Sequence, residues 1–173
     1  MSAFLLMMII LSVYEREDHR TVAQKLERAM RLTRMKEYHN EDFGYTVRVP
    51  SFFEQTEDSL MEKGCCRFSF WQDSTEIVQT VFIERNQDSL TLEQTMEKYA
   101  SDLHATWQQK GEGCFILSGH LFTEDGRMTS RRYYAKFVKH RKLWFVQTLA
   151  YPEDCEQAVQ RLIREIHDWL VWE

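Results

Sequence analysis

FGYTVRVPSFF, at residues 43–53, is the stretch of this chain that decides its fold. Apolar side chains occupy positions 43, 45, 47 and 49, and Gly44, Thr46 and Arg48 alternate with them. A two-residue period is typical of a β-strand with one buried face. Pro50 lacks the N–H that would extend a hydrogen-bonded ladder, so the strand ends there. The stretch predicts the start of a compact α+β domain that continues to the C-terminus.

Further strands are predicted at residues 66–70, 77–83, 114–123, 131–139 and 143–151. Residues 77–83 are apolar on both sides, as in a central strand that is covered on each face. Asp125-Gly126 and His140-Arg141-Lys142 mark tight turns. Neighbouring strands joined by tight turns must be antiparallel. The pattern therefore predicts an antiparallel sheet of about six strands.

Two long helices are available to cover this sheet. The first begins with the capping-box pattern Thr91-x-x-Gln94, and Gly111 stands where a C-terminal cap is expected. Its apolar residues recur every three or four positions, at Leu92, Met96, Tyr99, Leu103 and Trp107. The second follows Pro152, which suits a first helical turn. Its broad apolar face comprises Val159, Leu162, Ile163, Ile166, Trp169 and Leu170.

Several segments together resemble the PsbP-like superfamily, over about residues 40–173. They are the Gly-Tyr-x-Val-x-Val-Pro-x-x-Phe opening at residues 44–53, Ser-Leu-Thr-Leu-Glu at 89–93, Gly119…Gly126-Arg127…Arg132-Tyr133-Tyr134, Leu-Trp-Phe-Val at 143–146, and the terminal helix. That group includes a photosystem II subunit, a nuclear-import factor that binds Ran, and small bacterial envelope proteins. The resemblance implies an α/β/α sandwich and an adaptor or assembly role. It implies no catalytic residues, because the group shares no catalytic motif, and the metal sites of some plant members have no recognisable counterpart here.

The N-terminal 37 residues divide into two segments that precede the predicted domain at 38–173. Residues 1–14 contain a nine-residue apolar run at 3–11, too short for a bilayer-spanning helix but of signal-peptide length. The run favours an exported, periplasmic protein over a cytoplasmic one, and any membrane contact is expected only through residues 3–13. Residues 15–37 predict a charged helix with a thin apolar stripe at Val22, Leu26, Ala29 and Met30, outside the core.

Charge is unevenly distributed in this chain of net charge -5. Residues 38–126 hold 16 acidic and 6 basic side chains, whereas residues 127–152 hold 7 basic and no acidic ones. The basic strand pair is either a docking surface for an acidic partner or the solvent-facing side of a hairpin whose edge is protected by charge. The candidate partner surface consists of Arg131, Arg132, Lys136, Lys139 and Arg141. The acidic remainder argues against binding to nucleic acid.

The sequence contains no assembled catalytic or metal-binding motif. Its four cysteines, Cys65, Cys66, Cys114 and Cys155, include no C-x-x-C pair, and their redox state stays open. On a strand, Cys65 and Cys66 would point to opposite faces. His39-Asn40-Glu41-Asp42 is interpreted as a solvated turn, although it could touch a cation. No metal or other cofactor is therefore predicted.

These observations favour a non-enzymatic binding or adaptor domain that engages a protein partner. One alternative is a carrier of a small apolar ligand, held in a pocket between the sheet and a helix. A third hypothesis is a thiol hydrolase that uses Cys66 or Cys114 with His120. Among the tryptophans, Trp71, Trp107, Trp144 and Trp169 are expected to pack in the core, and Trp172 to be exposed.

Overall fold

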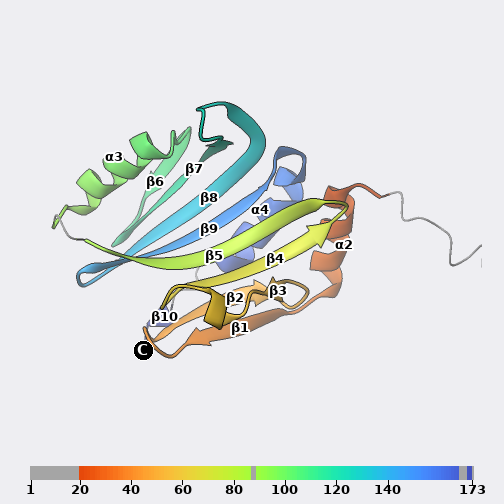
Figure 1. Ribbon diagram of the computed structural model, residues 1–173, viewed down its shortest axis with the longest axis horizontal. Helices are drawn as coiled ribbons and strands as arrows, with labels where there is room; N and C mark the ends of the chain where they lie inside the picture. The colour runs from red at the N-terminus through yellow and green to blue at the C-terminus, as the bar shows by residue number, and fades with distance from the viewer. Residues whose placement is uncertain (1–19, 87–88, 168–170, 173) are drawn as a thin grey trace, which may run out of the picture.

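The structure is a computed structural model that describes residues 20–86, 89–167 and 171–172 (Figure 1). The apolar segment at 1–14, the first residues of the predicted charged helix, and Trp169 and Leu170 lie outside the described residues. None of the helices in the described part of the chain is both long enough and apolar enough to cross a membrane.

Among the described residues, the main sheet has seven antiparallel strands in the order β3-β4-β5-β9-β8-β7-β6. Its strands are β3 (Glu54–Gln55), β4 (Cys66–Gln72), β5 (Thr75–Arg85), β6 (Trp107–Lys110), β7 (Cys114–Phe122), β8 (Met128–His140) and β9 (Leu143–Pro152). The predicted antiparallel arrangement is confirmed, and β5 lies inside the sheet between β4 and β9. The tight turns lie at the predicted positions, with Gly126 and Arg141 at positive φ.

The opening stretch forms strand β2 (Tyr45–Pro50), but this strand belongs to a second, smaller sheet of order β1-β2-β10. Its partners are β1 (Met35–Asn40) and β10 (Val171–Trp172). The predicted alternation is confirmed, since Tyr45, Val47 and Val49 are fully buried. The turn before β2 places Gly44 at φ +63°, and β1 pairs back across it. Strand β1 therefore occupies residues that the sequence assigned to the charged helix or to the start of the domain.

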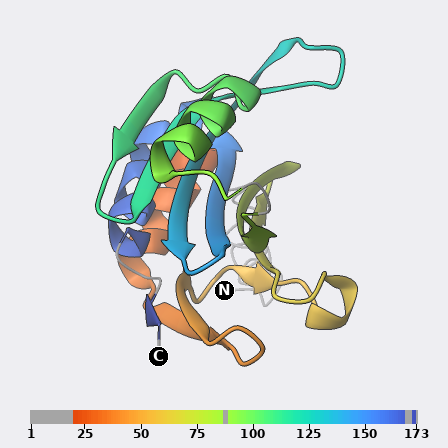
Figure 2. The same cartoon turned by 90° about the vertical axis from the view of Figure 1, so that its left-hand side faces the viewer.

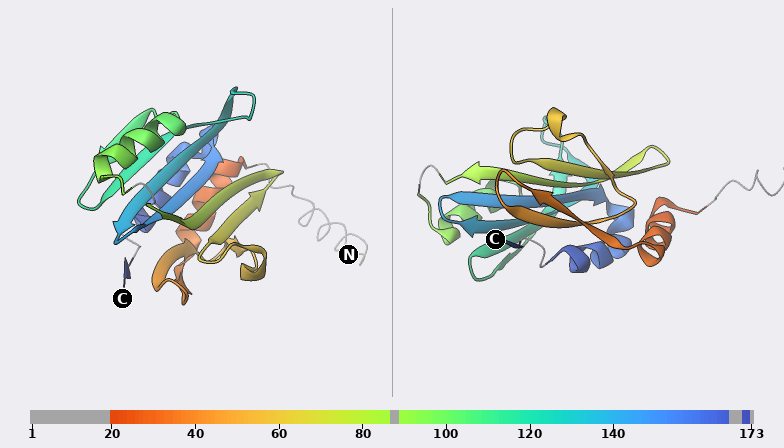
Figure 3. Two further views of the ribbon diagram at one scale, coloured as in Figure 1. Left: turned by 60° about the vertical axis from the view of Figure 1, so that its left-hand side comes forward. Right: turned by 90° about the horizontal axis from the view of Figure 1, so that it is seen from below.

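In the described part of the chain, three helices cover the two faces of the main sheet. Helices α2 (Val22–Leu32) and α4 (Glu156–Ile166) lie side by side on one face, and α3 (Leu92–Asp102) lies on the other (Figures 2 and 3). Short 3-10 turns occupy Asp58–Leu60 (η1) and Glu153–Cys155 (η2). Pro152 ends β9 and caps η2, so it precedes the first turn of α4 instead of forming it.

Helix α2 corrects the expectation that residues 15–37 contribute nothing to the core. Leu26 is fully buried and Met30 almost so, and both belong to the core cluster beneath α4. A narrow apolar stripe suffices because α2 packs mainly against α4 and the short turn η2. The helix is also shorter than expected, since it ends at Leu32.

Helix α3 begins as predicted and ends earlier. The Thr91–Gln94 capping box is present, but the helix stops at Asp102, and His104 adopts φ +50°. Residues 107–110 then pair with β7 as strand β6, so Gly111 does not cap the helix. Gly119 of β7 allows the turn after α3 to approach the sheet closely, because a Cβ at this position would lie 3.1 Å from the His104 carbonyl oxygen. The Tyr133 hydroxyl donates a hydrogen bond to the Leu103 carbonyl at 3.1 Å and fixes the end of α3.

The sheet separates two hydrophobic clusters. The larger one lies between the sheet, α2, α4 and β2, and includes Phe68, Ile77, Phe145, Leu149, Val159 and Leu162. The smaller one lies under α3 and includes Phe115, Leu117, Tyr133, Ala135, Phe137, Trp144 and Val146. Trp144 is buried as predicted, but Trp71 and Trp107 are 59% and 49% exposed, which corrects the prediction that both pack in the core.

Candidate functional site

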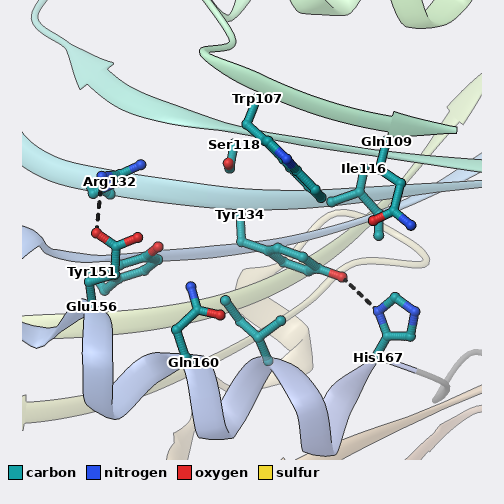
Figure 4. A pocket seen from close by; sticks show the side chains of 11 residues that line it. Trp107, Gln109, Ile116, Ser118, Arg132, Tyr134, Tyr151, Glu156, Gln160 and His167 are labelled. Atoms are coloured by element: carbon teal, nitrogen blue, oxygen red, sulfur yellow. Dashed lines mark hydrogen bonds and ion pairs between the residues drawn. The ribbon is translucent and has the colours of Figure 1, made fainter.

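A groove of about 470 Å³ lies between α4 and the part of the sheet formed by β6, β7 and β8. We call it the α4 groove; it is lined by Trp107, Gln109, Ile116, Ser118, Arg132, Tyr134, Tyr151, Glu156, Gln160, Ile163 and His167. Figure 4 shows Trp107 pointing from the sheet into this space and Gln160 facing it from the helix.

The groove exists because the helix layer is narrower than the sheet. A helix is about 10 Å across and covers roughly two strands, which are spaced about 4.8 Å apart. Helix α4 packs on β9 and β2, with α2 beside it. The same face of β7 and β6 therefore extends beyond the helices, and the groove lies between this part of the sheet and α4.

The floor of the groove is apolar, and its rim carries an aromatic ring. Ile116 and Tyr134 are buried on β7 and β8, whereas Trp107 on β6 is half exposed. Trp107 is opposite Ser118, and Gln109 is opposite Ile116, so alternate residues of β6 face the groove. A half-exposed indole beside a concave surface is a typical anchor in protein recognition.

Polar contacts join the sheet to α4 at both ends of the groove, and Figure 4 shows the Arg132–Glu156 and Tyr134–His167 contacts. Arg132 Nη1 lies 3.0 Å from Glu156 Oε2, which joins β8 to the first turn of α4. At the other end, Tyr134 Oη lies 3.5 Å from His167 Nδ1, and the Lys136 ammonium donates a hydrogen bond to the His167 carbonyl. Among the residues that line the groove, the charge of Arg132 is therefore balanced by Glu156.

The five basic residues of the candidate partner surface do not share one face. Arg132 and Lys136 face α4, whereas alternation along β8 places Arg131 and Lys139 on the α3 side. Arg131 donates to the Glu76 carbonyl at 2.8 Å, and Lys139 lies 5.6 Å from the Trp144 ring centroid. Arg141 is exposed at the tip of the β8–β9 hairpin. Whether any of them binds an acidic partner stays a prediction.

The structure separates the cysteines from the histidine proposed as their catalytic partner. Cys114 and His120 are six residues apart on β7, a distance of about 20 Å. Cys66 is in register with the β7 residue Ile116 four strands away, about 19 Å across the sheet. Burial also raises the pKa of the Cys66 thiol to about 12, so that this thiol is protonated at neutral pH and a weak nucleophile.

His120 lies on β7 and is mostly buried, with Nε2 3.8 Å from Glu153 Oε1. Its Nδ1 is buried and has no hydrogen-bond partner among the described residues. His104 is exposed in the turn after α3. Cys65 is half-buried and precedes β4, whereas Cys66, the first residue of β4, is buried.

The tetrad at residues 39–42 spans the end of β1 and the following turn. His39 Nδ1 lies 3.0 Å from Thr46 Oγ1, and Asp42 forms an ion pair with Lys63 at 3.2 Å. Asn40 is buried and accepts a hydrogen bond from the Phe43 N–H, so it stabilises the turn. Within the described ranges, no three His, Cys, Asp or Glu side chains converge to hold a metal ion.

A second pocket, of about 420 Å³, lies between the sheet and α3. We call it the α3 pocket; its apolar lining includes Phe82, Leu121, Phe122, Tyr133, Ala135, Phe137 and Val146. Glu84 and Tyr99 lie at its margin, and the Tyr99 hydroxyl donates a hydrogen bond to the Glu84 carboxylate. Desolvation raises the pKa of Glu84.

An antiparallel sheet with α2 and α4 on one face and α3 on the other is the PsbP-like α/β/α sandwich, as predicted. The protein is similar to the PsbP protein CyanoP of Synechocystis, with a TM-score of 0.57 and 14% identity over 80% of this chain and 92% of that one. It is also similar to the Ran-binding protein Mog1p of Saccharomyces cerevisiae, with a TM-score of 0.59 and 13% identity over 81% and 96%. A third similar structure is the protein of unknown function PA94 from Pseudomonas aeruginosa, with a TM-score of 0.51 and 10% identity over 76% of this chain and 92% of that one. No protein-family model matches the chain, and no curated protein matches its sequence.

The residues of the α4 groove were missed by the sequence analysis, apart from Arg132. Trp107 was assigned to a helix because it continues the spacing of Leu92, Met96 and Tyr99. A signal for strand β6 was nevertheless present. Gly111-Glu112-Gly113 separates residues 107–110 from the strong strand at 114–122, and a short glycine-containing link between two extended runs is typical of a hairpin.

Proposed function

We propose that this protein is a non-enzymatic binding or adaptor domain that engages a protein partner through the α4 groove. The observation that carries the proposal is the half-exposed Trp107 beside an apolar, concave floor. Solvent-exposed aromatic residues next to a pocket are enriched among the residues that dominate protein binding. The separation of His120 from Cys66 and Cys114 by about 20 Å supports binding over thiol chemistry.

The Ran-binding role printed for Mog1p supports protein recognition as a use of this fold. Fold kinship alone does not transfer a partner. The groove itself supplies the chemistry: an indole, two isoleucines and two tyrosine rings, with Arg132 already neutralised by Glu156. The partner should therefore present an apolar side chain to the groove, and the binding should depend weakly on salt.

Site-specific photo-crosslinking tests the proposal in cells of the source organism. A benzoylphenylalanine at position 109, inside the groove, should form an adduct with a partner protein that mass spectrometry identifies. The same group at position 60, an exposed residue of η1, is the control. Failure to form an adduct at 109, or formation of the same adduct at 60, would contradict the proposal.

The α3 pocket favours a second candidate function, the carriage of a small apolar ligand. Its volume of about 420 Å³ exceeds the roughly 300 Å³ that a small-molecule site needs. A dansylated fatty acid should bind the wild-type protein with increased fluorescence, and Ala150→Trp, which fills the pocket from β9, should abolish the increase. Equal fluorescence of the two proteins would eliminate this candidate.

A further inference from the structure

Strand β6 is a free edge of the main sheet. It pairs with β7 on one side and with no described strand on the other. All residues from 106 to 113 are exposed, so no described segment covers this edge. An uncovered strand edge presents backbone donors and acceptors that can accept another strand.

The register shows which backbone groups of β6 are free. Gly111 donates its N–H to the Cys114 carbonyl at 2.9 Å, which makes these two residues a hydrogen-bonded pair. Backbone groups alternate in direction along an antiparallel strand. Gln109 and Trp107 therefore direct their backbone groups toward β7, whereas Gln108 and Lys110 direct theirs away from the sheet.

The side chains of the same strand divide between the two faces. Trp107 and Gln109 line the α4 groove. Lys110 lies on the opposite face, where it forms an ion pair with Glu93 of α3. An edge lysine can prevent strand addition, but this one is held away from the groove. The other edges differ, because β3 has two residues and β1 carries Lys36 and Glu37.

We propose that an extended segment of the partner adds to β6 as an additional strand and places an apolar side chain against Trp107, at the mouth of the α4 groove. The inference rests on the proposed function and specifies the kind of partner. Free backbone groups at Gln108 and Lys110 provide the hydrogen bonds, and the groove provides side-chain selectivity, which is the division of roles in strand addition.

A linear segment fits this edge better than a second copy of the protein. Strand β6 has four residues and spans about 13 Å. Edge-to-edge pairing over that length buries far less than the roughly 1,200 Å² that a stable dimer needs. A short peptide needs hydrogen bonds to the backbone of only two residues, here Gln108 and Lys110, when one of its side chains is anchored in an adjacent pocket.

The test uses linear 12-residue peptides selected by phage display against the full-length protein. With the selected peptide bound, amide hydrogen exchange at Gln108 and Lys110 should slow at least tenfold. Gln108→Pro removes an outward-facing N–H and no bond to β7, so it should weaken the peptide at least tenfold. Gln108→Ala keeps that N–H and should bind within twofold of wild type.

Methylation of the peptide provides a second measurement that does not depend on the stability of the proline variant. N-methyl groups at the peptide amides that face β6 should prevent binding, and methylation of the alternate amides should not. Any one of four results would overturn the inference. They are unchanged amide exchange at Gln108 and Lys110, equal peptide affinities of Gln108→Pro and Gln108→Ala, a dimer of the protein by light scattering, and the absence of any binding peptide. If adducts still form at position 109 in these cases, the proposed function stands and strand addition alone is wrong.

Discussion

Arg132 and Lys136 lie four residues apart on β8 and hold the two ends of helix α4. The Arg132 guanidinium pairs with Glu156 in the first turn, and the Lys136 ammonium binds the His167 carbonyl at the C-terminal end. Four strand residues span about 13 Å, and eleven helical residues span about 16 Å, so the spacings match. The helix dipole also favours two of these charges. The Glu156 carboxylate lies at the positive end of α4, and the Lys136 ammonium lies at the negative end. These two basic residues thus position one wall of the α4 groove.

Replacement of Lys136 by glutamate should destabilise the protein by about 2 kcal/mol or more, because it buries an acidic group beside the negative end of α4. Arg141→Glu makes the same change of charge at an exposed turn and should alter the free energy of unfolding by less than about 0.5 kcal/mol. Urea denaturation followed by circular dichroism measures both. Equal effects of the two substitutions would contradict a structural role for Lys136.

Helix α2 should contribute to stability as an integral part of the core. Leu26 is 0% exposed and Leu32 is 75% exposed on the same helix. Leu26→Ala should lower the free energy of unfolding by about 2–5 kcal/mol, as for other buried leucines, and Leu32→Ala by less than about 0.5 kcal/mol. The two variants differ in burial and not in chemistry. If Leu26→Ala is as mild as Leu32→Ala, α2 is a peripheral extension after all.

The strand and cap signals predicted much of the fold because they are local. Alternation at Tyr45, Val47 and Val49 depends on neighbours two residues away, and the Thr91–Gln94 cap spans four residues. The depth at which Leu26 is buried depends on α4, about 130 residues later in the chain. A thin apolar stripe gives no indication of such a cover.

The candidate site was less predictable for the same physical reason. Trp107 and Gln109 are on a strand because β7 supplies hydrogen-bond partners, which outweigh the helical spacing of the preceding apolar residues. The groove depends on the order of the strands, since α4 packs on β9 and β2, reaches β8 only at its two ends, and leaves β7 and β6 uncovered. Strand order between distant segments is not encoded in any short pattern.

Stability should decrease in alkaline solution because of buried thiol and phenol groups. Burial raises the pKa of Cys66 from its ordinary value of 9.0 to about 12, and of Tyr151 from 10.0 to about 12. The folded state then binds more protons than the unfolded state between these values, so the free energy of unfolding falls as the pH rises from 9 to 12. Each group contributes a slope of at most about 1.4 kcal/mol per pH unit.

Urea denaturation at half-unit intervals from pH 8 to pH 11, under reducing conditions, measures this slope. Cys66→Ala should lower overall stability and flatten the decrease above pH 9. The matched control is Cys114→Ala, which removes a thiol that is only half-buried at the start of β7. A slope in Cys66→Ala that equals that of wild type would show that this thiol ionises as readily in the folded protein as in the unfolded chain.

Trp107 should control binding at the α4 groove without controlling stability. Its indole is half exposed, so Trp107→Ala should change the free energy of unfolding by no more than about 1 kcal/mol. The same substitution should weaken a groove-binding peptide at least tenfold, as expected of an aromatic anchor. Trp71→Ala, which removes a similarly exposed indole from β4 near the opposite edge of the sheet, should leave the affinity unchanged.

Fluorescence distinguishes direct contact from an indirect effect on the fold. An exposed indole emits at longer wavelength than one that a ligand covers, so binding should shift the wild-type emission to the blue. The shift should persist in Trp71→Phe and disappear in Trp107→Phe, even at peptide concentrations that saturate the variant. Retention of the shift without Trp107 would place the peptide elsewhere on the molecule, because Trp71 and Trp144 lie on β4 and β9.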